Sequence, residues 1–133
     1  MKNIFKFFGI LIATVILTSC VGSKDISVPQ GTVPDNLTAE QIERAVDEAA
    51  LTYNWQIKKT NDHEYIAFHS QKGLSATVKI TFTDNSYRIT HVSSVGLSYN
   101  YDKKTVHSRY NTWVQNLNKS LEDHLRATSR RSI

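Results

Sequence analysis

The chain has little cysteine, proline and glycine: one cysteine, two prolines and five glycines among 133 residues. A single cysteine excludes a disulfide within the chain, so a folded domain must be stabilised by packing. A strong excess of one charge is also missing, because the chain has 16 basic and 12 acidic residues. Nucleic-acid-binding domains show a much stronger basic excess, and we therefore expect no nucleic-acid partner.

Patterns typical of metal binding or catalysis are equally scarce. No two of the five histidines lie four residues apart, and no serine stands in a Gly-x-Ser-x-Gly turn. We therefore predict no metal site, no cofactor and no catalytic residue, and we do not expect an enzyme.

The histidines have simpler interpretations than catalysis. We expect Asp62-His63-Glu64 to form a charged turn, His69 to be a solvated strand residue and His91 to be a partly buried one. His69 and His91 could still meet if the strand order permits. The alternative is a small enzyme acting on cell-wall or lipid substrates, which requires a deep pocket gathering His91 or His107 with a carboxylate.

The first 20 residues form a targeting signal. Lys2 and Lys6 precede the apolar run 7–17, which has the length of a secretory signal and is too short for a membrane span. The run closes in Leu17-Thr18-Ser19-Cys20, with a small residue directly before the cysteine. This motif resembles the lipobox of bacterial lipoproteins. The alternatives are an uncleaved anchor and a plain signal peptide with a chance cysteine.

The resemblance implies that residues 1–19 are a signal peptide and that Cys20 becomes lipidated. The thiol would carry a diacylglyceryl group and the new amine an acyl chain, which together anchor the protein lastingly at about 0.8 kcal/mol per buried CH₂. The next residue is Val21. Aspartate there retains enteric-type lipoproteins in the inner membrane, so the resemblance implies the outer membrane, with the protein facing the periplasm.

Residues 20–36 are interpreted as the lipidated cysteine and a flexible tether. The segment after Cys20 holds both prolines and two of the five glycines, without apolar periodicity. Its 16 residues would reach about 50 Å when stretched and roughly 22 Å as a flexible coil. We expect the domain to stand off from the membrane.

Residues 37–133 are predicted to form one domain that begins and ends with a helix. Thr38 and Gln41 have the spacing of a capping box, and Leu37 and Ile42 that of a hydrophobic staple. The first helix should end near Asn54. A second apolar stripe at helical spacing predicts a helix that begins near Asp102 or Thr105 and runs to about Ala127.

Between the helices, from Trp55 to Tyr101, the apolar period is two. Ile66 and Phe68 alternate with Tyr65, Ala67 and His69. In the fourth run we expect Tyr87 and Ile89 to point inward, and the same alternation offers an inward position for His91. Three turn sequences divide the region into four strands joined as hairpins. The predicted fold is a two-layer α+β domain, a four-stranded antiparallel meander with both helices on one face. The other face is dominated by threonine, lysine and arginine.

The segment from Tyr99 to Leu117 is the predicted functional region because it is dense in aromatic residues with polar ends. Its string Tyr-Asn-x-Trp-Val-x-Asn-Leu, residues 110–117, is similar to the last helix of small uncharacterised proteobacterial lipoproteins, a resemblance that implies no activity. The predicted binding patch comprises Tyr99, Tyr101, His107, Asn111 and Trp113. The alternative, which the helical spacing of Tyr110, Trp113 and Leu117 favours, is that this region belongs to the core.

Three functions follow as hypotheses. The first is a membrane-anchored envelope lipoprotein with a non-enzymatic binding or structural role. It would bind an envelope protein or glycan through the sheet edge, the threonine-rich face or the predicted patch. The second is an inhibitor or immunity-type protein that blocks a periplasmic hydrolase with a loop, and the third is the small enzyme described above.

Overall fold

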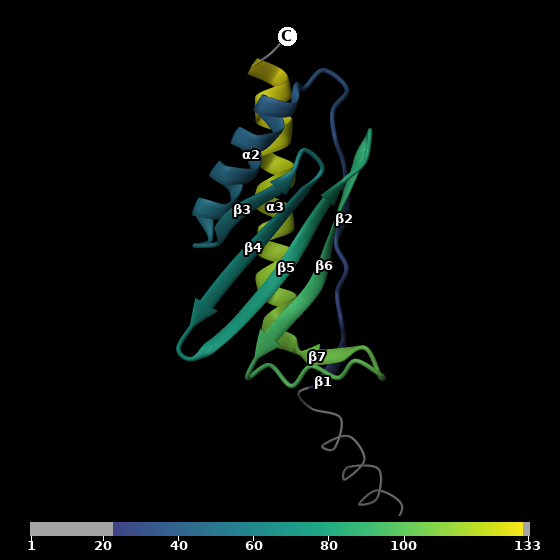
Figure 1. Cartoon of the computed structure of the whole chain (residues 1–133), viewed down its shortest axis with the longest axis vertical. Helices are drawn as coiled ribbons and strands as arrows, with labels where there is room; N and C mark the ends of the chain where they lie inside the picture. The colour runs from purple at the N-terminus through teal and green to yellow at the C-terminus, as the bar shows by residue number, and fades with distance from the viewer. Residues whose placement is uncertain (1–22, 132–133) are drawn as a thin grey trace, which may run out of the picture.

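The computed structural model describes residues 23–131. The predicted signal peptide and the predicted lipidation site Cys20 lie outside the described residues. Figure 1 shows two layers, with a twisted sheet in front of two helices that lie side by side. Within the described part of the chain, no helix is long and apolar enough to cross a membrane.

Seven strands and two helices make up the described chain. In order they are β1 (Ser23–Asp25), β2 (Gln30–Thr32), α2 (Ala39–Thr52), β3 (Gln56–Asn61), β4 (Glu64–Gln71), β5 (Leu74–Phe82), β6 (Ser86–Val95), β7 (Thr105–His107) and α3 (Ser108–Arg131).

The strands form two antiparallel sheets. The larger sheet has the order β2-β6-β5-β4-β3, and the smaller one pairs β1 with β7. The predicted α+β class is confirmed, and β3 to β6 are consecutive antiparallel neighbours as expected. The four-stranded meander is nevertheless incomplete as a description, because β2 adds a fifth strand beside β6.

The tether prediction is wrong for residues 23–36, which belong to the fold. β1 and β2 both lie in this segment, and Val33 is part of the core with 5% of its surface exposed. Each strand has only three residues, too few to show an alternating pattern. Gly31 pairs with Tyr87 of β6. A glycine is needed at this position, since a Cβ there would lie 2.5 Å from the tyrosine ring.

Helix α2 begins as predicted. The Thr38 hydroxyl accepts from the Gln41 amide at 3.2 Å, and the Gln41 side chain accepts from the Thr38 amide at 2.9 Å. Leu37 and Ile42 both pack against the core. The helix ends at Thr52, two residues before Asn54, which has a positive φ of 62°.

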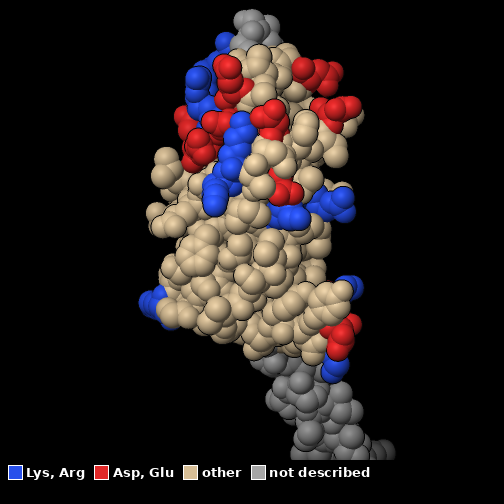
Figure 2. All heavy atoms as spheres, in the orientation of Figure 1, with Lys and Arg blue, Asp and Glu red and all other residues tan. Residues whose placement is uncertain are grey.

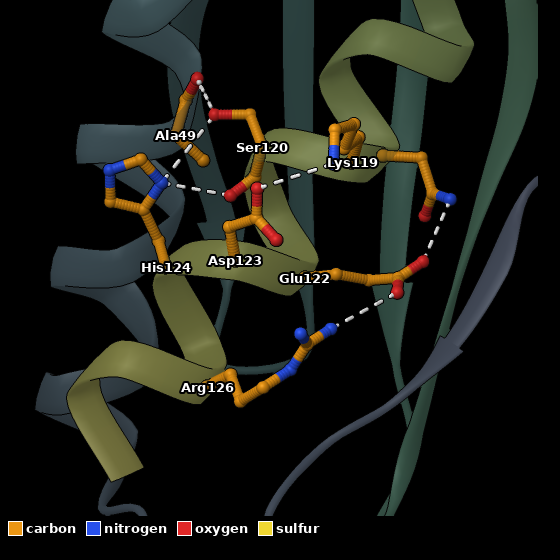
Figure 3. A network of polar contacts seen from close by, with 8 residues as sticks. Ala49, Lys119, Ser120, Glu122, Asp123, His124 and Arg126 are labelled. Carbon is orange, nitrogen blue, oxygen red and sulfur yellow. Dashed lines mark hydrogen bonds and ion pairs between the residues drawn. The ribbon is translucent and has the colours of Figure 1, made fainter. Parts of the chain in front are cut away.

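Small residues let the two helices pack closely. Ala45, Ala49 and Ala50 are fully buried on α2, and the Ser120 hydroxyl of α3 donates to the Ala49 carbonyl at 3.0 Å (Figure 3). The His124 ring lies next to this contact, with its Nδ1 atom 2.8 Å from the backbone carbonyl of Ser120. The alanine stripe therefore faces α3.

Helix α3 begins at Ser108, later than the sequence predicts, because residues 105–107 form β7. Its outer side carries Lys119–Asp123 and Arg126–Glu122 ion pairs at 3.8 and 3.6 Å (Figure 3). Exposed pairs of this kind contribute little to stability. The helix is held mainly by its apolar stripe, whose buried members include Val114, Leu117, Leu121 and Leu125.

In the described part of the chain, α2 and α3 cover one face of the large sheet (Figure 1), which we call the covered face. From β4 to β6 its central residues are Tyr65, Ala67, Val78, Ile80, Tyr87 and Ile89, all at most 2% exposed. His69 also lies on this face and is buried, so the prediction of a solvated strand residue is wrong. The inward placement of Tyr87 and Ile89 is confirmed.

Candidate functional site

The opposite face of the large sheet, which we call the open face, is a candidate interaction surface. The strand register arranges its side chains in four rows. Two rows contain charged residues: Gln30–Arg88–Thr81–Glu64 and Thr90–Lys79–Ile66–Lys58. The other two rows are uncharged: Ser93–Thr77–Phe68–Gln56 and Val95–Ser75–Ser70. The open face therefore has a charged half and an uncharged half.

The uncharged half lies toward the β4–β5 turn and the end of β6. In Figure 2 it is the lower part of the sheet surface, where neutral side chains replace the red and blue ones above. Phe68 is 38% exposed there and Val95 is 61% exposed. Val92, 48% exposed, is the extra residue of a bulge between β6 and β5. Apolar side chains left exposed together on one surface are typical of binding sites.

A second candidate is a cavity of about 410 Å³ around His69, which we call the His69 cleft. It lies where the end of α2, the end of β4 and the first half of α3 meet. The His69 ring is flanked by Trp55 and Trp113, with ring centroids 5.2 and 4.6 Å away. The lining is Thr52, Tyr53, Asn54, Trp55, His69, Ser70, Gln71, Thr112, Trp113 and Asn116.

The tautomer of His69 follows from its hydrogen bond. Its Nδ1 lies 3.1 Å from the Asn54 carbonyl, which can only accept, so Nδ1 carries the proton. In the neutral ring Nε2 is then a hydrogen-bond acceptor. No aspartate, glutamate, lysine or arginine lines this cleft. The cleft thus offers aromatic edges and neutral polar groups, without a carboxylate to pair with the imidazole.

His91 lies in a different cluster from His69. Its ring stacks on Tyr99 at 3.8 Å between centroids, meets Tyr110 at 5.3 Å, and places Nε2 3.0 Å from the Ser94 hydroxyl. Burial lowers the pKa of His91 and raises that of Tyr110. The partly buried position predicted for His91 is confirmed. The two histidines do not meet, because β5 separates β4 from β6.

The five residues of the predicted binding patch have different environments. Tyr101 is 72% exposed beside Lys104, and Tyr99 is partly exposed on His91. His107 lies in β7, where its Nδ1 accepts from the Arg109 amide at 3.0 Å. The two remaining residues are tied into the fold.

Asn111 and Trp113, the other two residues of the predicted binding patch, are held in the fold by their contacts. The Asn111 side chain donates to the Asp25 carbonyl and accepts from the Ser27 amide, each at 2.9 Å, and so fastens the first described residues to α3. Trp113 is 8% exposed in the His69 cleft. Only Tyr99 and Tyr101 therefore present a large part of their surface to a partner.

Neither a metal centre nor a known family is indicated. Residues 23–131 contain no group of three histidine, cysteine, aspartate or glutamate side chains placed to hold a metal ion. No protein-family model matches the chain, and comparison with curated proteins gives no significant match. Any function must therefore be inferred from the residues and surfaces described above.

Proposed function

We propose that the chain is a lipoprotein of the bacterial cell envelope, anchored in the outer membrane through Cys20 and facing the periplasm. Its role is non-enzymatic binding of another envelope protein. The lipobox residues 17–20 support the anchor. The single observation that supports the binding role is the open face, a whole side of the sheet that residues 23–131 leave uncovered and of which half carries no charge.

The chemistry of the uncharged half favours a protein partner. Phe68, Val92 and Val95 supply exposed apolar area, and the serines and threonine between them supply short hydroxyl groups. Charged residues are depleted at the centre of protein interfaces and aromatic residues such as phenylalanine are enriched there, which fits the absence of charge and the exposed Phe68. A glycan would instead need a broad exposed aromatic platform, and the uncharged half carries one aromatic ring, that of Phe68, at 38% exposure.

The anchor is tested by intact mass measurement of the protein extracted from membranes. The expected mass lacks residues 1–19 and includes the lipid on Cys20, and Cys20→Ser should abolish both changes. A retained leader or a free thiol would show that this part of the proposal is wrong.

The binding role is tested by photo-crosslinking in intact cells. A crosslinker at Phe68 should give one adduct, while a control at Lys119, on the outer side of α3, should give none. The identified partner should then bind the purified protein, with binding lost in Phe68→Ser and kept in Lys119→Ser. Equal crosslinking at both positions, or unchanged binding by Phe68→Ser, would contradict the proposal.

Inhibition of a periplasmic hydrolase is the competing function, supported by one observation. Tyr101 is 72% exposed in a loop closed by pairing of Asn100 with Thr105 and could enter an active site. If the crosslinked partner is a hydrolase, its activity should fall when the protein is added. Relief of that inhibition by Tyr101→Ser, with no effect of Phe68→Ser, would favour the inhibitor.

A further inference from the structure

The chain enters the described domain at one end, which we call the anchor end. It consists of β1, β7, the loop 96–104 and the β4–β5 turn, and it forms the lower end in Figure 1. Ser23 of β1 pairs with His107 of β7. The loop and the turn are neighbours, since a Cβ on Gly96 would lie 2.5 Å from the Leu74 side chain.

Covalent geometry places the proposed lipid close to this end. Ser23 is three residues after Cys20, so their Cα atoms are at most about 11 Å apart. β1 is held in place because the Ile26 amide donates to the Lys104 carbonyl at 2.9 Å and Asn111 binds the Asp25 and Ser27 backbone. The anchor end therefore cannot move far from a bilayer that holds the Cys20 lipid.

The charges of the anchor end suit an anionic surface. Its exposed basic residues outnumber its acidic residues, Asp25 and Asp102, and are Lys24, Lys72, Lys103 and Lys104. The other ten of the 12 acidic residues lie elsewhere. On the face shown in Figure 2, most red side chains lie over the upper part of the molecule.

Its aromatic residues suit the same surface. Tyr101 is 72% exposed, and the Lys104 ammonium lies 4.9 Å from its ring centroid. Tyr99 is 37% exposed in the same loop. Tyrosine rings favour the headgroup level of a bilayer, where the ring is partly buried and the hydroxyl stays hydrated.

We infer that the anchor end docks on the anionic phospholipid headgroups of the membrane that carries the Cys20 lipid. This inference rests on the proposed anchor and adds a defined orientation to it. Lys103, Lys104 and Tyr101 make the contact, and the opposite end of the domain, where α2 begins, points away from the bilayer. The uncharged half of the open face is then held beside the membrane surface.

The orientation is tested with the processed, lipidated protein in vesicles. Because Cys20 is the only cysteine and its thiol carries the diacylglyceryl group in the processed protein, an introduced cysteine gives one free thiol for a fluorophore. The label is placed at Ser98→Cys in the anchor-end loop, or at Asp84→Cys in the exposed β5–β6 turn as the matched control. The vesicles contain phosphatidylglycerol and a lipid with a nitroxide quencher on its headgroup.

Docking predicts strong quenching at position 98 and weak quenching at position 84. Replacing both Lys103 and Lys104 by glutamine should lower the ratio of docked to undocked protein about fivefold per lysine, since each cation near an anionic surface contributes ~1 kcal/mol. The control Arg44→Gln/Lys58→Gln removes two exposed cations from other parts of the domain and should leave the ratio unchanged.

Three other outcomes would refute the docking, its orientation or the lipid anchor, respectively. Equal quenching at positions 98 and 84, in protein whose mass shows the lipid, refutes docking and leaves the anchor intact. Stronger quenching at Val95→Cys than at Ser98→Cys refutes this orientation in favour of the open face lying on the membrane. Protein without the lipid refutes the proposed anchor, and the docking inference with it.

Discussion

The covered and open faces of the large sheet are made by the same strands but differ in burial and in the residues that surround each side chain. Ile80 on the covered face is 1% exposed, and its neighbours are apolar. Ile66 on the open face is half-buried and lies between lysines. The covered face therefore determines stability, while the open face is free to determine what the protein binds.

The largest expected difference between the faces comes from a matched pair of isoleucine substitutions. Ile80→Ala should lower the free energy of unfolding by about 3 kcal/mol, because it leaves a cavity among packed side chains. Ile66→Ala should cost less than about 1 kcal/mol, since water can reach the site. Urea unfolding of both variants measures the difference, and equal losses would show that the two faces are equally important for stability.

A smaller effect is expected where the edge strand β2 pairs with β6. Gly31→Ala would place a Cβ 2.5 Å from the Tyr87 ring, which is buried and held by a 2.6 Å hydrogen bond to Asn118. We expect a loss of about 2 kcal/mol from overpacking. Thr32→Ala, at the exposed next residue, is the control and should change the unfolding midpoint little. A neutral Gly31→Ala would mean that β2 is not fixed against the sheet.

The smallest effect concerns His91, at the margin of the covered face. Burial lowers its pKa, so the unfolded chain binds a proton more readily than the folded protein. The stability associated with His91 is therefore complete above its unfolded pKa of about 6.5 and falls as the pH drops below that value. Urea midpoints at about pH 8 and about pH 5 should show a smaller decrease in His91→Gln than in the wild type. An identical decrease would contradict this assignment.

Features that depend on nearby residues were predictable from the sequence. The capping box at Thr38 and Gln41 is confirmed because its partners are three residues apart. The hairpins of β3 to β6 are confirmed because their turns carry the expected polar residues and glycine.

Features that depend on residues far apart in the chain could not be predicted from the sequence. In β4 the sequence is apolar in both phases, so alternation could not decide between Ile66 with Phe68 and Tyr65 with Ala67. β1 and β2 depend on partners far along the chain, and so does the role of Asn111. The uncharged half of the open face is assembled from four strands, and its existence follows only from their register.

Helix α3 also sets a length scale. Its 24 residues rise by about 36 Å, from the anchor end toward the opposite end, where α2 begins (Figure 1). With the anchor end against the headgroups and the helix upright, the domain would extend over a distance comparable to the bilayer's hydrocarbon thickness of about 30 Å. A partner bound to the open face would meet it within that layer of periplasm and would itself have to come close to the membrane.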